Sequence, residues 1–217
     1  ACTAASRVLV HDSIHDQLVD KLTAAVRRLK VGNGADPTTH VGPMVTREHQ
    51  QRVLEFIALG KTEGAHIAAE AALPHEPHLR DGCFVAPTVF TGVRPQMRIA
   101  KEEIFGPVLS VLRFGSFEQA IEIANGTEFG LVAGIYTADP LLATRASREI
   151  EAGIVFINNY NRAVLGTPFG GTKASGYGRE HCIDTLKEFG YSKTVRIPTG
   201  RGEIGRWFAA TEATTAP

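Results

Sequence analysis

The spacing of apolar residues in the first part of the chain predicts short strands that alternate with amphipathic helices. Apolar residues recur every three to four positions over Ile14–Leu29 and Thr46–Glu63, a spacing typical of helices with one buried face. In the second helix this spacing turns Val53, Phe56 and Gly60 inward. Short runs rich in β-branched and aliphatic residues predict strands at Val8–Val10, Ala65–Ala69 and Phe84–Phe90.

From residue 108 onward, strand and helix patterns alternate regularly. Strands are predicted at Val108–Phe114, Leu131–Tyr136, Ile154–Ile157 and Tyr191–Ile197, and helices at Phe117–Asn125, Leu141–Glu151 and Arg179–Phe189. Ser116 and Asp139 are suitable N-cap residues for the first two of these helices. The near-continuous apolar run Ile154–Ile157 is typical of a strand buried on both faces. The pattern predicts an α/β fold with a mostly parallel sheet covered by helices.

Composition and charge narrow the classes of protein. The 217 residues suffice for one ample domain, and 23 basic residues balance 23 acidic ones, so no charge footprint for nucleic acid or an anionic membrane is evident. No apolar run is long enough to span a bilayer. The three cysteines, in no CxxC spacing, argue against a disulfide framework or a metal site and favour a reducing, cytoplasmic location. The chain begins at Ala1 without a signal-peptide pattern.

Two stretches differ from ordinary turns. The polar loop Asn158–Thr167 follows an apolar strand, where ligands of open α/β sheets commonly bind, and leads into Pro168–Glu180. That second segment holds four glycines within nine residues, which suggests a backbone that passes closely by something else. A surface Ω-loop without any ligand is an equally good interpretation.

The stretch Ala100–Pro107, called the shelf below, holds two carboxylates, an aromatic residue and a Gly-Pro turn before a strand. Residue types alone favour a helix end with solvated charges. The alternative is a ligand-binding shelf, with a carboxylate on sugar hydroxyls and Phe105 against a flat ring. Cys2 by itself is more typical of an inert, small apolar residue than of a nucleophile, although Arg7 could hold a thiolate.

Taken together, the segments resemble the C-terminal, catalytic half of the aldehyde dehydrogenase superfamily. Ala1–Arg7 is similar to the end of its cysteine motif, and Lys101–Val108 to its E-E-x-F-G-P signature. Asn125 with Phe129–Leu131 is similar to the A-N-x-x-x-[YF]-G-L stretch, and Pro168–Glu180 to P-F-G-G-x-K-x-S-G-x-G-R-E. These blocks occur in the family's order and cover roughly residues 1–197.

The resemblance implies roles for particular residues. Cys2 would be the nucleophile that attacks the aldehyde carbon, and its backbone N–H an oxyanion donor. Glu103 would bind the nicotinamide ribose and Phe105 would pack beside the nicotinamide of NAD or NADP. Phe169 would line the aldehyde pocket, as would Arg162 and Ala163 in the loop where members differ. Two further positions, His49 and Arg52, lie on a helix that approaches the cofactor in relatives; Cys83 and Cys182 match no functional position.

The resemblance also implies an organisation. Residues 1–189 would form a three-layer α/β/α catalytic domain, residues 190–197 an oligomerisation arm, and residues 198–217 a flexible tail. The arm strand Tyr191–Ile197 would join the sheet of a neighbouring copy in a homodimer or homotetramer. No G-S-T-x-x-G phosphate turn is present, so the dinucleotide-binding half, with the general base, is expected upstream of this chain.

The parent protein is therefore expected to oxidise an aldehyde to a carboxylic acid with NAD or NADP, and the isolated chain to be inactive. Two alternatives remain open. One is a thiol hydrolase or acyltransferase that uses Cys2 without nicotinamide, although none of the eight histidines lies in a recognisable catalytic motif. The other is a folded, self-associating module without catalysis. Neither the aldehyde nor the choice between NAD and NADP follows from these residues.

Overall fold

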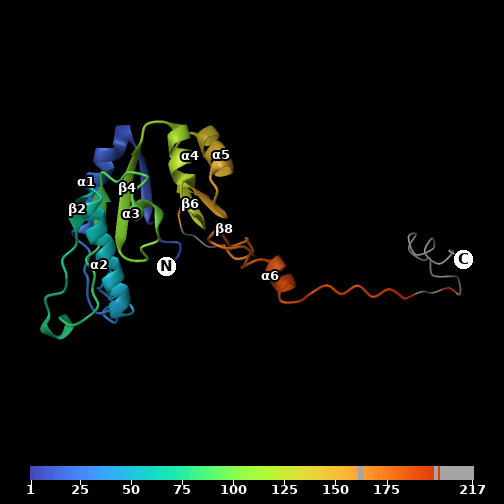
Figure 1. Ribbon diagram of the computed structural model, residues 1–217, viewed down its shortest axis with the longest axis horizontal. Helices are drawn as coiled ribbons and strands as arrows, with labels where there is room; N and C mark the ends of the chain where they lie inside the picture. Colours follow the sequence, from blue (N-terminus) through green and yellow to red (C-terminus); the bar gives the residue numbers. More distant parts are fainter. Residues whose placement is uncertain (161–163, 198–199, 201–217) are drawn as a thin grey trace, which may run out of the picture.

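The computed structural model describes residues 1–160, 164–197 and 200 (Figure 1). The strands are β1 (Arg7–His11), β2 (His66–Glu70), β3 (Thr88–Thr91), β4 (Val108–Phe114), β5 (Phe129–Gly130), β6 (Val132–Ile135), β7 (Ile154–Ile157) and β8 (Thr172–Lys173). The α-helices are α1 (His15–Val26), α2 (Arg47–Thr62), α3 (Arg98–Lys101), α4 (Phe117–Asn125), α5 (Pro140–Glu149) and α6 (Ile183–Glu188). Short 3₁₀ turns cover Asp12–Ile14 and Pro77–Leu79.

The strands form one larger sheet and two small ones. The larger sheet has the order β1-β4-β3-β2, in which β4 pairs in parallel with both β1 and β3, while β2 is antiparallel to β3. The strands β6 and β7 form a separate parallel pair, and β5 and β8 an antiparallel one. The expected α/β fold is confirmed, with a mixed sheet in place of a single, mostly parallel one.

Helices cover both faces of the larger sheet, as expected for three layers. Neighbouring residues of one strand point to opposite faces, so Val89 and Val111 join a cluster with α1, whereas Phe90 and Leu112 join the cluster that holds α2 and α4. Phe90 and Leu112 are completely buried. This second cluster is the larger, and it fixes α2 and α3 on the face from which the shelf emerges.

The helix signals in the sequence are confirmed at several ends. Thr46 caps α2 by accepting a hydrogen bond from the backbone N–H of His49, and Val53, Phe56 and Gly60 are buried as predicted. Ser116 caps α4, and Asp139 caps α5, in which Pro140 is the first residue. These signals are local, which is why the sequence alone reveals them.

Three predicted elements differ in the structure. The helix predicted from Arg179 starts at Ile183, because His181 has a φ of 64° that no right-handed helix contains. The strand Ile154–Ile157 is not buried on both faces: Ile157 is 43% exposed, and β6 is its partner strand within the described residues. The segment Tyr191–Ile197 forms no strand, since no described strand lies beside it to complete a ladder.

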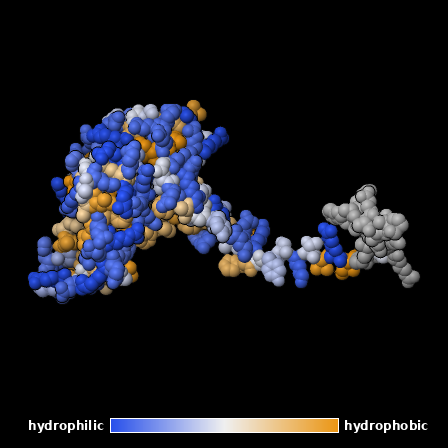
Figure 2. All heavy atoms as spheres, viewed as in Figure 1, coloured by the Kyte–Doolittle hydropathy of each residue, from blue (hydrophilic) through white to orange (hydrophobic). Residues whose placement is uncertain are grey.

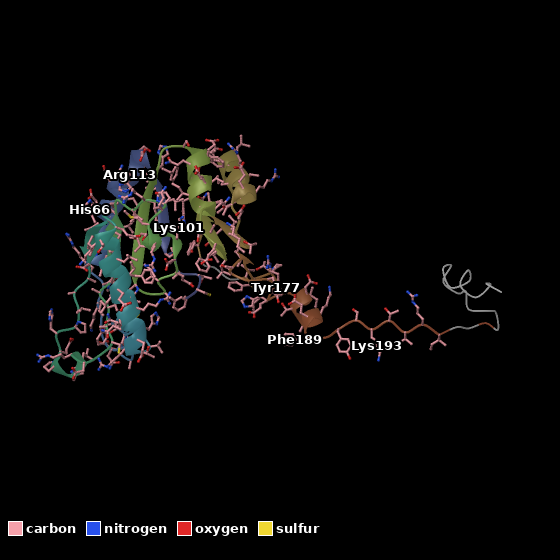
Figure 3. All side chains as sticks on the ribbon, viewed as in Figure 1. His66, Lys101, Arg113, Tyr177, Phe189 and Lys193 are labelled. Carbon is pink, nitrogen blue, oxygen red and sulfur yellow. The ribbon has the colours of Figure 1, made fainter. Side chains whose placement is uncertain are left out.

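The segment after α6 projects away from the rest of the described chain (Figure 1). Its apolar side chains are uncovered, with Phe189 88%, Tyr191 90% and Ile197 76% exposed. Figure 2 shows apolar residues along this projection, and Figure 3 shows Phe189 and Lys193 extending from it into solvent. The predicted tail at residues 198–217 lies, apart from Gly200, outside the described residues.

Candidate active site

The larger sheet places Cys2 and the shelf at the same edge. The strands β1 and β4 are parallel neighbours, and Arg7 stands opposite Ser110 in their register. The backbone N–H of Ser110 donates to the carbonyl oxygen of Ser6 at 3.0 Å. Cys2 and Phe105 each lie five residues before one member of the Arg7–Ser110 pair. Because β1 and β4 are parallel, both strands begin at the same edge of the sheet. The segments that hold Cys2 and Phe105 therefore enter the sheet at that edge.

The Cys2 thiol is free and exposed. Arg7 does not hold the Cys2 sulfur. Its guanidinium instead donates to the carbonyl oxygens of Ile123 at 3.0 Å and Ala124 at 2.9 Å, at the end of α4. Burial in this position lowers the pKa of Arg7. Among the described residues, no side chain hydrogen-bonds the Cys2 thiol, which leaves this sulfur open to a reaction partner.

Helix α2 fixes the backbone of the shelf at three points. The guanidinium Nη2 of Arg52 donates to the carbonyl oxygen of Glu103 at 2.9 Å, and Nε2 of His49 donates to that of Phe105 at 2.8 Å. Gly106 packs so closely on the helix that a β-carbon there would lie 2.7 Å from the methyl groups of Val53. His49, Arg52 and Val53 lie within one turn of α2, so they face the shelf together.

The two carboxylates of the shelf have different surroundings. Glu102 forms a two-pronged ion pair with Arg98, which lowers the pKa of Glu102. The carboxylate of Glu103 is exposed and forms no hydrogen bond or ion pair with any residue that the structure describes. The sequence favoured solvated charges for both positions; this description fits the exposed Glu103, whose carboxylate is available to a ligand, whereas Glu102 is paired with Arg98.

Phe105 has an unusual backbone for a bulky residue. Its φ is 55°, in the left-handed region, and its side chain is 49% exposed. The hydrogen bond from His49 and the tight packing of Gly106 hold it in this conformation. Strained residues cluster at functional sites, and here the strain presents an aromatic ring beside the free carboxylate of Glu103.

In the glycine-rich stretch Pro168–Glu180, the backbone passes so close to other parts of this chain that a side chain would clash. A β-carbon on Gly153 would lie 1.9 Å from the carbonyl oxygen of Gly170, and one on Gly170 would lie 2.4 Å from that of Gly178. Gly171 is similarly close to Ser175. The predicted close passage is confirmed, and its partner is this chain itself.

Phe169 stands at the start of this passage. Its backbone N–H donates to the carbonyl oxygen of Glu180 at 2.9 Å, and the N–H of Glu180 donates back to the carbonyl oxygen of Phe169 at 2.7 Å. The ring of Phe169 is half-buried, and its centroid lies 5.2 Å from that of His181. The sequence contains no indication of a role for His181. Nothing in the residue pattern predicts its left-handed backbone or its contact with Phe169.

Two other motif residues connect secondary structure elements. Asn125 donates from Nδ2 to the carbonyl oxygen of Glu149 at 2.8 Å and accepts from the N–H of Glu151 at 2.9 Å. Lys173 donates to the carbonyl oxygens of Asn125 at 2.9 Å and Thr127 at 3.2 Å, and pairs with the carboxylate of Glu151. These contacts join α4, β8 and the end of α5.

The remaining predicted residues are placed as follows. Arg162 and Ala163 lie outside the described residues. Tyr160 packs against Gly134 and Phe156, and burial raises the pKa of its hydroxyl. Within the described part of the chain, no hydrogen bond or ring contact joins Cys2, the shelf and Phe169 to one another.

A shallow hollow lined by Leu29–Val31 and Ala72–Glu76 contains none of the predicted site residues.

Two kinds of feature are absent from the described residues. No three of their histidine, cysteine, aspartate or glutamate side chains are grouped so that they could hold a metal ion. No helix over the same residues has the length and apolarity needed to cross a membrane. Cys2, Cys83 and Cys182 are all free thiols, and Cys182 caps α6.

Comparisons with known proteins agree on one family. The profile described as "Aldehyde dehydrogenase family" matches residues 1–195. An aldehyde dehydrogenase from Didymella fabae is 51% identical over 207 residues, covering 95% of this chain and 42% of the relative. A betaine aldehyde dehydrogenase from Mesorhizobium japonicum is 43% identical, with 92% of this chain and 41% of the relative covered. The chain thus spans about two fifths of the length of these relatives.

Solved structures give the same result. An aldehyde dehydrogenase from Bacillus cereus superposes with a TM-score of 0.82 at 43% identity, over 87% of this chain and 38% of that one. A betaine aldehyde dehydrogenase from Staphylococcus aureus, in complex with NAD⁺, superposes with a TM-score of 0.89 at 36% identity. That match covers 96% of this chain and 42% of the other.

Proposed function

Because the chain belongs to the aldehyde dehydrogenase family, we propose that the protein containing it oxidises an aldehyde to a carboxylic acid with NAD or NADP. These residues would supply the catalytic half, and a dinucleotide-binding half would come from a segment outside them. The observation that carries the proposal is that the free Cys2 thiol and the Glu103–Phe105 pair lie just before two adjacent parallel strands, β1 and β4, at one edge of the sheet.

The chemistry of a thiol suits this reaction. The Cys2 thiolate adds to the aldehyde carbon and forms a tetrahedral thiohemiacetal, whose oxyanion accepts a hydrogen bond from the backbone N–H of Cys2. The oxyanion collapses as the former aldehyde hydrogen leaves as hydride, which gives a thioester on Cys2. Water then adds to the thioester, the carboxylic acid leaves and the thiol is restored. A bound nicotinamide would supply the acceptor for this hydride.

The shelf fits a nicotinamide nucleotide. The exposed carboxylate of Glu103 can accept hydrogen bonds from both hydroxyl groups of a ribose, and the exposed ring of Phe105 offers a flat apolar face. His49 and Arg52 hold the backbone of these two residues and thereby fix the position of both groups. The NAD⁺ complex of the Staphylococcus aureus relative supports this class of cofactor.

The proposal extends to the substrate pocket and to assembly. Phe169, Arg162 and Ala163 would line the aldehyde pocket. The uncovered apolar arm Tyr191–Ile197 would add as a strand to another copy in a homodimer or homotetramer, which accounts for its exposure here. Residues 1–189 would be the catalytic domain, residues 190–197 the arm and residues 198–217 a tail. Three free thiols support a cytoplasmic location.

The test is NADH or NADPH formation, followed at 340 nm, with the full-length protein and a panel of aldehydes. We expect activity in the wild type and none in Cys2→Ala. Activity retained by Cys2→Ala would reject Cys2 as the nucleophile. Glu103→Gln should weaken cofactor binding or slow hydride transfer. Unchanged kinetics would show that Glu103 is a surface charge without a role in cofactor binding.

The same assay, together with an ester-cleavage assay without nucleotide, addresses the alternatives. The isolated 217-residue chain should form no NADH, because the proposed dinucleotide-binding half lies outside it. A thiol hydrolase would cleave an activated ester or thioester without nucleotide, and would lose that activity in Cys2→Ala. An inert module would do neither. No histidine among the described residues hydrogen-bonds the Cys2 thiol, so the structure lends the hydrolase no support.

A further inference from the structure

We propose that His181 is a positioning residue that holds the ring of Phe169 in one orientation, and that the protein therefore prefers aldehydes with a flat aromatic group over short aliphatic ones. This inference rests on the proposed function, in which Phe169 lines the aldehyde pocket. It assigns a role to a residue that no motif of the sequence singled out.

The two rings form a defined pair. Their centroids are 5.2 Å apart and their planes are inclined by 32°. This separation falls within the range in which aromatic rings attract one another. Phe169 is half-buried and His181 is exposed, so the pair lies at the surface with Phe169 the more covered of the two rings.

The backbone fixes both members of the pair. Phe169 and Glu180 exchange two hydrogen bonds of 2.9 and 2.7 Å, which brings the next residue, His181, beside the Phe169 ring. The carbonyl oxygen of His181 accepts a hydrogen bond from the N–H of Gly166 at 2.9 Å. The loop between these segments carries Tyr177, which extends into solvent in Figure 3.

The conformation of His181 limits what can replace it. Its φ of 64° is left-handed, a region that histidine and asparagine enter more readily than most residues and that glycine enters freely. The imidazole forms no hydrogen bond with any described residue, so its described contact is the ring of Phe169. Removal of the ring should therefore affect Phe169 and leave the backbone path unchanged.

A fixed ring favours a flat partner. An aromatic aldehyde that stacks on Phe169 gains contact over its whole face, and it gains more when the ring of Phe169 is already ordered before binding. A short aliphatic aldehyde has little area to place on that face. Loss of the His181 ring should thus weaken binding of an aromatic aldehyde about three- to tenfold, and that of a short one hardly at all.

The test is steady-state kinetics of the full-length protein with benzaldehyde and propanal. His181→Asn and His181→Gly both remove the ring and both accept the left-handed backbone, so one of them serves if the other does not fold. We expect a three- to tenfold rise in KM for benzaldehyde, kcat within about twofold, and an unchanged KM for propanal.

Other outcomes would overturn the inference. If the ring-less variants change KM for both aldehydes equally, or change neither, His181 serves only to build the loop. If the wild type is active but does not prefer benzaldehyde, the substrate class is wrong although the proposed function survives. If the wild type oxidises no aldehyde, the proposed function fails and the inference fails with it.

Discussion

The Nε2 atom of His49 donates a hydrogen bond to the carbonyl oxygen of Phe105 at 2.8 Å, across 56 residues of sequence. This bond restrains a residue whose left-handed backbone costs roughly 1–3 kcal/mol. A hydrogen bond of this kind contributes about 0.5–1.5 kcal/mol, so the bond from His49 offsets a substantial part of that cost. Helix α2 therefore keeps the Phe105 ring in place before any ligand arrives.

Replacing His49 by leucine should loosen the shelf. Leucine has similar bulk but no donor, so Phe105 should leave its left-handed conformation and KM for NAD or NADP in the full-length protein should rise severalfold. His49→Gln is the matched control, because its amide N–H can donate to the same carbonyl oxygen. An equal rise in KM for both variants would show that the hydrogen bond is not the cause.

Gly106→Ala should destabilise the protein by about 1–3 kcal/mol through overpacking. The new methyl group would lie 2.7 Å from the methyl carbons of Val53, which is completely buried and stiff at χ1. Val53→Ala removes those carbons, so the double variant should be more stable than the sum of the two single effects predicts. Urea unfolding of the four proteins measures this coupling; simple additivity would contradict the contact.

Asn125→Leu should lower the free energy of unfolding by about 1–3 kcal/mol, because two backbone groups near the end of α5 lose their partners. Asn159→Leu is the control, since Asn159 is exposed and hydrogen-bonds no described residue. It should change the unfolding free energy by no more than about 0.5 kcal/mol. Similar losses in the two variants would rule out the bridging role of Asn125.

Stability should depend on pH through Asp36. The Lys30 ammonium at 2.8 Å, followed by the N–H and hydroxyl of Thr38, holds the pKa of Asp36 well below its ordinary 3.8. A depressed pKa in the folded state stabilises the protein above the unfolded-state value, and this contribution is lost as pH falls through the folded-state value. The stability difference between wild type and Asp36→Asn should thus be largest near pH 5–7 and shrink below pH 3.8. Urea unfolding across this range checks it; a constant difference would contradict it.

Much of the fold follows from local signals. The helices α4 and α5 begin at their predicted caps, because a cap depends on a few neighbouring residues. The segment Tyr191–Ile197 has the composition of a strand but forms none, since a strand requires a partner that composition does not specify. The splitting of the sheet likewise depends on contacts far apart in sequence.

The candidate site was predicted in part. Motifs singled out Cys2, Glu103, Phe105 and Phe169, and their family roles remain proposals. The left-handed backbones of Phe105 and His181 were not predicted, because φ at these positions is set by tertiary contacts. The difference between Glu102 and Glu103 also emerged only from the structure, in which Arg98 pairs with the first carboxylate and leaves the second free.

The tightly packed glycines constrain how this sequence can evolve. At Gly106 the obstacle is the side chain of Val53, so a lineage could accept a larger residue after shortening that valine. At Gly153 and Gly170 the obstacles are backbone carbonyl oxygens, which every amino acid carries. Because these oxygens belong to the backbone, no substitution at a second position removes them. We expect descendants of this sequence to exchange position 106 together with position 53, and to retain glycine at positions 153 and 170 while the residues around the pocket diverge.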